Sequence, residues 1–304
     1  MRVFDGHCDT AFELWRREEG LLQNTCHIDL CRAQTLENYA QVFAFCSYAG
    51  QPGVFAKPED ALSLPLAVLR RELEKNVGRI APAKNAREIQ AVWSQGKTAA
   101  LLSLEGPESI DCDPAHLAAL HAQGFIMTTL TWNADNSLAG CHLTGAPLTE
   151  KGRDFVRAAE ETGMLLDVSH LSERAFWQLC EMAGRPIVAS HSNCKALCAH
   201  SRNLTDDQLC AVAQLGGTVG LNLYPPFLGG DADFGMLLRH LEHMLCLCGE
   251  EHVALGGDLD GCDVLASGFT GVDGYAAFWN YLRGRGYDDG LLENIFWKNL
   301  MRLL

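Results

Sequence analysis

Short apolar runs alternate with helical segments along the whole chain, and this alternation limits the folds that are open to it. Eight runs are typical of strands: Arg2–His7, 41–47, 98–104, 125–132, Met164–Val168, Ile187–Ala189, 218–223 and Val253–Gly257. Helical apolar spacing marks most of the intervening segments, among them 58–76, Asp113–Gln123, Glu150–Glu161, Asp206–Leu215 and Phe234–Leu247. Eight such units in 304 residues predict a (β/α)8 barrel.

The domain organisation follows from the same pattern. No linker or shift in composition divides the sequence, so we expect residues 1–304 to form a single barrel domain, with two more helices between Tyr275 and Leu304. A doubly wound open sheet is the structural alternative. That fold favours a glycine-rich nucleotide turn after its first strand, whereas residues 5–13 read DGHCDTAFE.

Composition and charge narrow the classes of partner. Hydrophobic residues make up 48% and charged residues 20%, which is a globular balance. A formal net charge of −14 argues against nucleic acid and anionic membranes, although a polycationic partner stays open. The 13 cysteines are scattered without a CxxC pair, and no charged leader opens the sequence. We therefore expect reduced thiols and a cytoplasmic location; a homodimer stays open.

The segment 163–204 carries the first functional signal. The runs Met164–Val168 and Ile187–Ala189 each lead to a Ser-His step, which gives His170 and His191. A helical segment joins the two runs, so the strands are expected to be parallel neighbours with both imidazoles on one rim. Two neutral imidazoles at one rim make half of a metal site.

The remaining strand ends supply further metal-binding side chains. His7 and Asp9 follow the first strand, Glu105 follows the third, Trp132 the fourth and Asp258 the eighth. Each has an ordinary alternative: a lone histidine is often structural, and Asp258 and Asp260 are typical turn residues. Together they give three histidines and three carboxylates, more than one tetrahedral zinc accepts. The set predicts two neighbouring divalent ions that share a carboxylate.

Arg202 lies eleven residues after His191, close to the same rim. It is either a structural ion pair or a clamp that binds a substrate carboxylate through two hydrogen bonds. The other histidines fall in loops or helices and are expected to be surface or core residues: His27, His116, His121, His142, His200, His240, His243 and His252.

Six segments together resemble one family. They are DGHCDT at 5–10, LEGPE at 104–108, LLDVSHLS at 165–172, PIVASHSNCKALCAHSRNL at 186–204, GLNLYPPFL at 220–228 and LGGDLDG at 255–261. In this order they resemble the membrane dipeptidase (renal dipeptidase) family of zinc peptidases, within the amidohydrolase group of metal-dependent barrels. The resemblance covers almost the whole chain and suggests a soluble member of the bacterial type.

The resemblance implies a role for each site residue. His7, Asp9 and Glu105 would bind one Zn²⁺, and Glu105 would bridge to a second Zn²⁺ bound by His170 and His191. A hydroxide held between the ions would attack the scissile carbonyl, with Glu105 and Asp258 catalytic and Asp258 serving as the acid/base. Arg202 would bind the free C-terminal carboxylate of a small dipeptide substrate, and L,D-dipeptides are expected to be accepted.

The main departure from the family lies at the fourth strand end. Mammalian members carry a histidine near the scissile carbonyl where this chain has Trp132, in LTWNADN, so the substrate contact there is expected to differ. Two alternatives follow. The same barrel and metals can act on another amide, an ester or a lactone, and a non-catalytic binding protein is a third reading, which the full set of ligands argues against.

Overall fold

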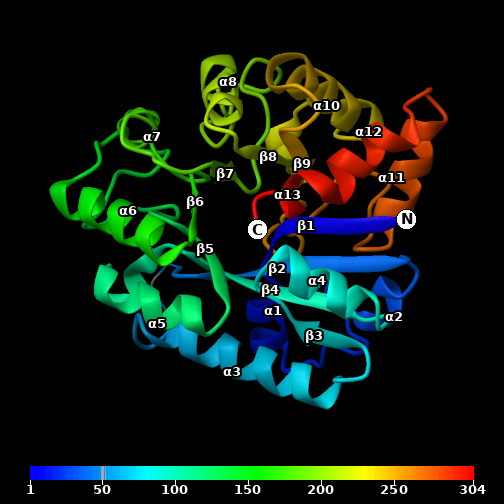
Figure 1. Ribbon diagram of the computed structural model, residues 1–304, viewed down its shortest axis with the longest axis horizontal. Coiled ribbons are helices and arrows are strands. Elements are labelled where there is room, and N and C mark those ends of the chain that lie inside the picture. Colours follow the sequence, from blue (N-terminus) through cyan, green and yellow to red (C-terminus); the bar gives the residue numbers. More distant parts are fainter. Residues whose placement is uncertain (49–50, 52) are drawn as a thin grey trace.

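Eight parallel strands close into a barrel in the computed structural model of the chain, which describes residues 1–48, 51 and 53–304 (Figure 1). In ring order they are β1 (Arg2–Cys8), β2 (Asn38–Cys46), β4 (Thr98–Glu105), β5 (Phe125–Thr129), β6 (Leu165–Asp167), β7 (Ile187–Ala189), β8 (Thr218–Leu221) and β9 (Val253–Leu255). The pairings of β1 with β9 and of β2 with β4 close the ring. The predicted (β/α)8 barrel is confirmed, and the open-sheet alternative is wrong.

A ninth strand, β3 (Ile80–Pro82), lies outside the ring. It pairs with Thr98–Ala100 of β4, before the stretch of β4 that pairs with β5. The sequence pattern did not predict β3, because three residues that end in proline show no strand period. The helices α1 (Thr10–Arg17) and α4 (Ala86–Trp93) are likewise additions to the predicted elements.

Helices surround the strands in Figure 1. The remaining helices are α2 (Leu30–Ala33), α3 (Asp60–Lys75), α5 (Leu117–Ala122), α6 (Glu150–Thr162), α7 (Glu173–Cys180), α8 (Asp206–Gln214), α9 (Pro225–Leu228), α10 (Phe234–Cys248), α11 (Gly274–Arg283), α12 (Asp289–Glu293) and α13 (Asn299–Met301). In the described part of the chain, no helix has both the length and the apolar character needed to span a bilayer.

Several predicted bounds differ from the observed ones. The strand expected over 125–132 ends at Thr129, and that over Val253–Gly257 ends at Leu255. The apolar runs therefore extend two or three residues beyond the strands at the carboxyl rim. The helix expected over Asp113–Gln123 is a 3₁₀ turn at Pro114–His116 followed by α5, with the Asp113 side chain accepting from the amide of Ala115. Helix α6 ends as predicted at Gly163, whose φ of 88° is left-handed.

Apolar side chains form two clusters, one on each face of the barrel wall. The larger cluster joins strands to the surrounding helices, and the smaller one gathers alternate strand residues such as Phe4, Ala99 and Val188 with Leu300 and Met301 of α13. Alternate residues of a strand share one face, so this second cluster fills the barrel interior.

Glycines in β8 and directly after β9 allow a close approach to the backbone of Ser190, which directly precedes His191. A Cβ on Gly256 would lie 1.7 Å from the carbonyl oxygen of Ser190, and one on Gly220 would lie 2.1 Å from it. Backbone cannot yield as a flexible side chain can, so these positions exclude even a methyl group.

We predict that Gly256→Ala lowers the free energy of unfolding by about 3 kcal/mol, because the methyl group forces β7 and β9 apart. Gly78→Ala is the matched control: its Cβ would meet no atom within 4 Å, and we expect a change within about 0.5 kcal/mol. Thermal unfolding of both variants measures the difference, and equal melting temperatures would contradict the prediction.

Candidate metal centre and active site

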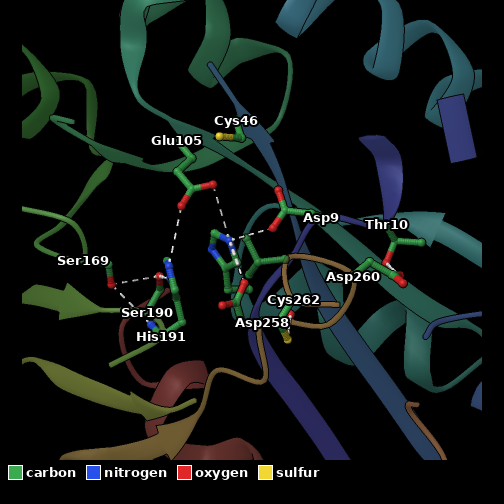
Figure 2. A network of polar contacts seen from close by, with 12 residues as sticks. Asp9, Thr10, Cys46, Glu105, Ser169, Ser190, His191, Asp258, Asp260 and Cys262 are labelled. Atoms are coloured by element: carbon green, nitrogen blue, oxygen red, sulfur yellow. Dashed lines mark hydrogen bonds and ion pairs between the residues drawn. The ribbon is translucent and has the colours of Figure 1, made fainter. Parts of the chain in front are cut away.

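The carboxyl rim brings the predicted histidines and carboxylates together. His7 and Glu105 belong to the last two residues of β1 and β4, while Asp9, His170, His191 and Asp258 follow β1, β6, β7 and β9 within a few residues. All six side chains are buried. Figure 2 shows Asp9, Glu105, His191 and Asp258 facing a common centre.

Glu105 stands between two groups of donors. Its Oε2 lies 3.6 Å from Nε2 of His7, which in turn lies 3.4 Å from Oδ2 of Asp9. Its Oε1 lies 2.8 Å from Nε2 of His170 and 3.6 Å from Nε2 of His191. Within each group the donor atoms lie within 4.8 Å of one another, so each of the two carboxylate oxygens serves a separate group.

The two Ser-His steps are held in register by Asp167 at the end of β6. Its Oδ1 accepts hydrogen bonds from the amides of Ser169, at 2.9 Å, and Ser190, at 3.0 Å. The hydroxyl of Ser190 donates to Oδ2 of Asp167, and Nδ1 of His191 lies 2.7 Å from the same hydroxyl oxygen. Because the only hydroxyl proton of Ser190 is used on Asp167, His191 must donate from Nδ1.

His170 is oriented in the same way by an amide. Its Nδ1 lies 2.8 Å from Oδ1 of Asn133, an acceptor, so the proton of a neutral His170 is on Nδ1. The Nε2 lone pairs of His170 and His191 then point at each other across 3.0 Å, with Oε1 of Glu105 beside them. Three electron-rich atoms that converge in a buried site fit a bound cation.

His7 gives an independent test of the same fit. Both of its ring nitrogens are buried and form no hydrogen bond with the described residues. Burial lowers the pKa of His7, but the carboxylates of Glu105 and Asp9 outweigh it and raise that pKa to about 10. Burial raises the pKa of Glu105 to about 8. Both pKa values are raised, which indicates a strongly negative, poorly solvated cluster that attracts positive charge.

Asp258 lies at the edge of this cluster. Its Oδ1 is 4.0 Å from Nε2 of His7, and its Oδ2 accepts a hydrogen bond of 3.1 Å from the amide of Asn222. Burial raises the pKa of Asp258 above the ordinary aspartate value, so the carboxyl group holds a proton more readily than an exposed aspartate does. Its φ of 56° is left-handed, which marks a strained turn at the rim.

A cavity of about 530 Å³ opens above the cluster. Its walls include Tyr48, Trp132, Asn133, His142, His200, Arg202, Tyr224 and Phe227. Arg202 is buried, lies 5.6 Å from the ring centroid of Phe227 and donates to the carbonyl of His191 at 3.4 Å. Its Nε has no hydrogen-bond partner, and its guanidinium forms no ion pair with the described residues. The structural ion pair considered for Arg202 is therefore not observed there.

Several residues that line the cavity were not among the predicted site residues, among them Asn133, His142 and His200. Asn133 directly follows Trp132, whereas His142 and His200 were expected to be surface or core residues and instead line the cavity. His142 lies 3.0 Å from Oδ1 of Asn133 through Nε2 and 2.8 Å from the hydroxyl of Ser201 through Nδ1. Burial, with the nearby Arg202, lowers the pKa of His142 to about 3, so the ring is neutral. Of these residues, only Asn133 could have been found from the sequence, because it is the direct neighbour of the predicted site residue Trp132.

A (β/α)8 barrel with a buried histidine and carboxylate cluster at its carboxyl rim defines a metal-dependent hydrolase of the amidohydrolase type. The sequence matches the family described as "Membrane dipeptidase (Peptidase family M19)" over residues 1–304, and the chain belongs to this family. It is accordingly a metallopeptidase of the dipeptidase class, and the reading as a non-catalytic binding protein is wrong.

Individual relatives match this chain over most or all of its length. An "uncharacterized protein in pqqA 5'region" from Klebsiella pneumoniae is 34% identical over 81% of this chain and 96% of its own length. A metallopeptidase from Rhodobacter sphaeroides, solved with a phosphinate mimic of the dipeptide L-Ala-D-Ala, has a TM-score of 0.88 at 29% identity, covering 100% of this chain and 98% of its own. The solved dipeptidase AC has a TM-score of 0.89 at 30% identity, covering 100% and 97%.

We predict that added Zn²⁺ raises the melting temperature of metal-stripped protein, because an ion bound only by the folded state stabilises it. The gain is about 2.7 kcal/mol when free metal exceeds Kd a hundredfold. His170→Ala removes one donor and should abolish most of the gain, whereas the exposed control His116→Ala should retain it. A full response of His170→Ala in a thermal shift measurement would contradict the prediction.

Proposed function

We propose that this chain hydrolyses dipeptides with a free C-terminal carboxylate at a pair of zinc ions. The observation that carries the proposal is Arg202, a buried guanidinium beside the donor cluster without an ion-pair partner among the described residues. An unpaired buried charge is costly, and a substrate carboxylate would neutralise it through two parallel hydrogen bonds. The metal cluster alone supports hydrolysis in general; Arg202 selects a carboxylate substrate.

The donor groups suggest how the ions are held. His7, Asp9 and Glu105 would bind one ion, and Glu105, His170 and His191 the other, with Glu105 contributing one oxygen to each. Imidazole nitrogen and carboxylate oxygen are ordinary zinc ligands, and the Nδ1–H tautomers of His170 and His191 leave Nε2 free to bind. When bound, the zinc ions activate water and polarise the scissile carbonyl.

The chain's own groups would manage the proton. Asp258 carries a raised pKa and is held by Asn222, so its carboxylate can take a proton from the attacking water and deliver it to the leaving amine. Arg202 would fix the substrate at its carboxylate, which restricts the orientation of the peptide bond over the cluster. Glu105 would act by holding both ions at a fixed separation.

The proposed hydrolysis of L,D-dipeptides rests on a similar protein of known structure. The Rhodobacter sphaeroides protein was solved with a mimic of L-Ala-D-Ala, at 29% identity and over the full length of this chain. We infer that L,D-dipeptides are among the substrates here as well. The cytoplasmic location, based on the scattered cysteines, and a homodimer stay predictions.

A panel of L,L-, L,D- and C-terminally amidated dipeptides tests the proposal, with metal content measured on the same sample. We expect zinc-dependent, chelator-sensitive hydrolysis of free dipeptides and weak hydrolysis of amidated ones. Equal rates for blocked and free substrates would instead favour an enzyme that acts on another amide or an ester.

We predict that Arg202→Lys raises KM for a free dipeptide about 10- to 100-fold, because lysine cannot form the two parallel hydrogen bonds. The amidated dipeptide lacks the charged carboxylate, so its kinetics should change little. Arg174→Lys, on the exposed side of α7, is the control. If Arg202→Lys affected both substrates equally, Arg202 would not bind the carboxylate.

We predict that Asp258→Asn lowers kcat by about 10²- to 10⁴-fold with metal content unchanged, because asparagine cannot transfer the proton. Asp263→Asn, an exposed carboxylate at the same cavity, should retain activity. Steady-state kinetics with metal analysis checks the result; loss of metal in Asp258→Asn would assign that residue to metal binding instead.

A further inference from the structure

Five aromatic rings gather on one side of the cavity, and we call them the aromatic wall: Phe12, Trp15, Tyr48, Phe55 and Trp132. Tyr48 and Trp132 line the cavity itself, with ring centroids 5.2 Å apart. Phe12 supports Tyr48 from behind at 4.2 Å, and Phe55 stacks on Trp15 at 4.8 Å. The wall is therefore a continuous apolar surface supported from the back rather than a pair of isolated rings.

Tyr48 is held in an unusual backbone conformation. Its φ of 50° lies in the left-handed region, which bulky side chains rarely adopt. Contact with Phe12, and the hydrogen bond of 3.0 Å from the amide of Gln51 to the Tyr48 carbonyl, stabilise it there. Strain of this kind persists where the surroundings fix it and is concentrated at ligand sites. Its effect here is to present the Tyr48 ring to the cavity.

The ring order of the strands places the wall opposite Arg202. Tyr48 follows β2 and Trp132 follows β5, so the wall spans the arc of the ring centred on β4. Arg202 follows β7 and lies over Phe227, which follows β8. In the closed ring of eight strands, β8 is directly across from β4. Between the two sides lies the donor cluster around Glu105.

A dipeptide bound in the proposed way crosses the cavity from one side to the other. With the carboxylate on Arg202 and the peptide bond over the cluster, the Cα of the N-terminal residue lies on the far side of the scissile bond, about 3.8 Å from the Cα of the C-terminal residue. The N-terminal residue then faces the aromatic wall. We propose, on the basis of the proposed function, that the aromatic wall binds the side chain of the N-terminal residue and selects large apolar or aromatic groups.

The charges of the cavity support the same selection. Among the described cavity residues, Arg202 is the single permanent cation, whereas Asp9, Glu105, Asp258 and Asp263 are acidic. With Arg202 bound to the C-terminal carboxylate of the substrate, an acidic N-terminal side chain would have no cationic side chain to pair with at the aromatic wall. A large apolar side chain instead buries its surface against Tyr48 and Trp132.

The test compares kcat/KM for dipeptides X-D-Ala with a free carboxylate, where X is Gly, Leu, Phe, Lys or Glu, on zinc-loaded enzyme. We expect Phe and Leu to exceed Gly by about 10- to 100-fold, with Glu lowest. Tyr48→Ala and Trp132→Ala should each reduce the Phe-to-Gly ratio about tenfold, mainly through KM for the Phe substrate, while Gly-D-Ala hydrolysis shows that the variants are folded.

Tyr48→Phe keeps the ring and should keep the ratio. Leu143→Ala is the matched control, since Leu143 lines the same cavity outside the wall and is 65% exposed. If Gly and Phe substrates react equally in the wild type, or if Lys matches Phe, the inference is overturned while the dipeptidase function stands. A preference that survives both alanine variants also overturns it. If no dipeptide is hydrolysed, the proposed function fails together with the inference.

Discussion

The site depends on the repulsion among electron-rich atoms that the fold forces together. Oε1 of Glu105 and the Nε2 atoms of His170 and His191 converge in a buried space, while Oε2 of Glu105 faces His7. Left without positive charge, such a cluster would have to take up protons, as the raised pKa values of His7 and Glu105 show. Asn133 and Ser190 prevent the simplest rearrangement, because each fixes the Nδ1–H tautomer of one histidine. The arrangement is consequently poised for a metal rather than for an ordinary hydrogen-bond network.

The barrel supports this cluster by tying together segments that are far apart in the sequence. Asp5 accepts hydrogen bonds of 3.0 Å from the amides of His7 and Gly257, and a third from the hydroxyl of Tyr275 in α11. The ends of β1 and β9 are therefore fixed just before His7 and Asp258. On the other side Asp167 fixes the two Ser-His steps. Two buried aspartates outside the donor set thus set the spacing of the histidines, and the close approach at Gly256 brings β7 and β9 together beneath them.

The sequence predicted the fold, and it predicted which histidines and carboxylates meet at the rim, because both depend on local patterns. A parallel strand in a barrel is a short apolar run, and its next few residues reach the rim, so His7, Glu105, His170, His191 and Asp258 could be found from strand ends alone. His142, His200 and Tyr48 could not be found in this way. They lie in loops whose positions depend on tertiary contacts, such as the isolated antiparallel β-bridge between the backbones of Cys141 and Leu171. The tautomers of His170 and His191 depend likewise on partners that no periodicity reveals. The short strand β3 carried too few residues to show a period.

The two sides of the cavity would recognise different parts of a substrate through different kinds of interaction. Arg202 is fixed by burial and by its contact with Phe227, so it would bind a charge that every free dipeptide carries, at a set distance from the donor cluster. In a tripeptide cleaved at its first peptide bond, the carboxylate lies about 3.8 Å further from that bond than in a dipeptide. The carboxylate of the tripeptide would therefore lie beyond Arg202 whenever the scissile bond was in place over the cluster. The separation between a buried cation and a metal-binding cluster would therefore limit the length of the substrate. It would also leave the aromatic wall free to distinguish side chains without altering the position of the reacting bond.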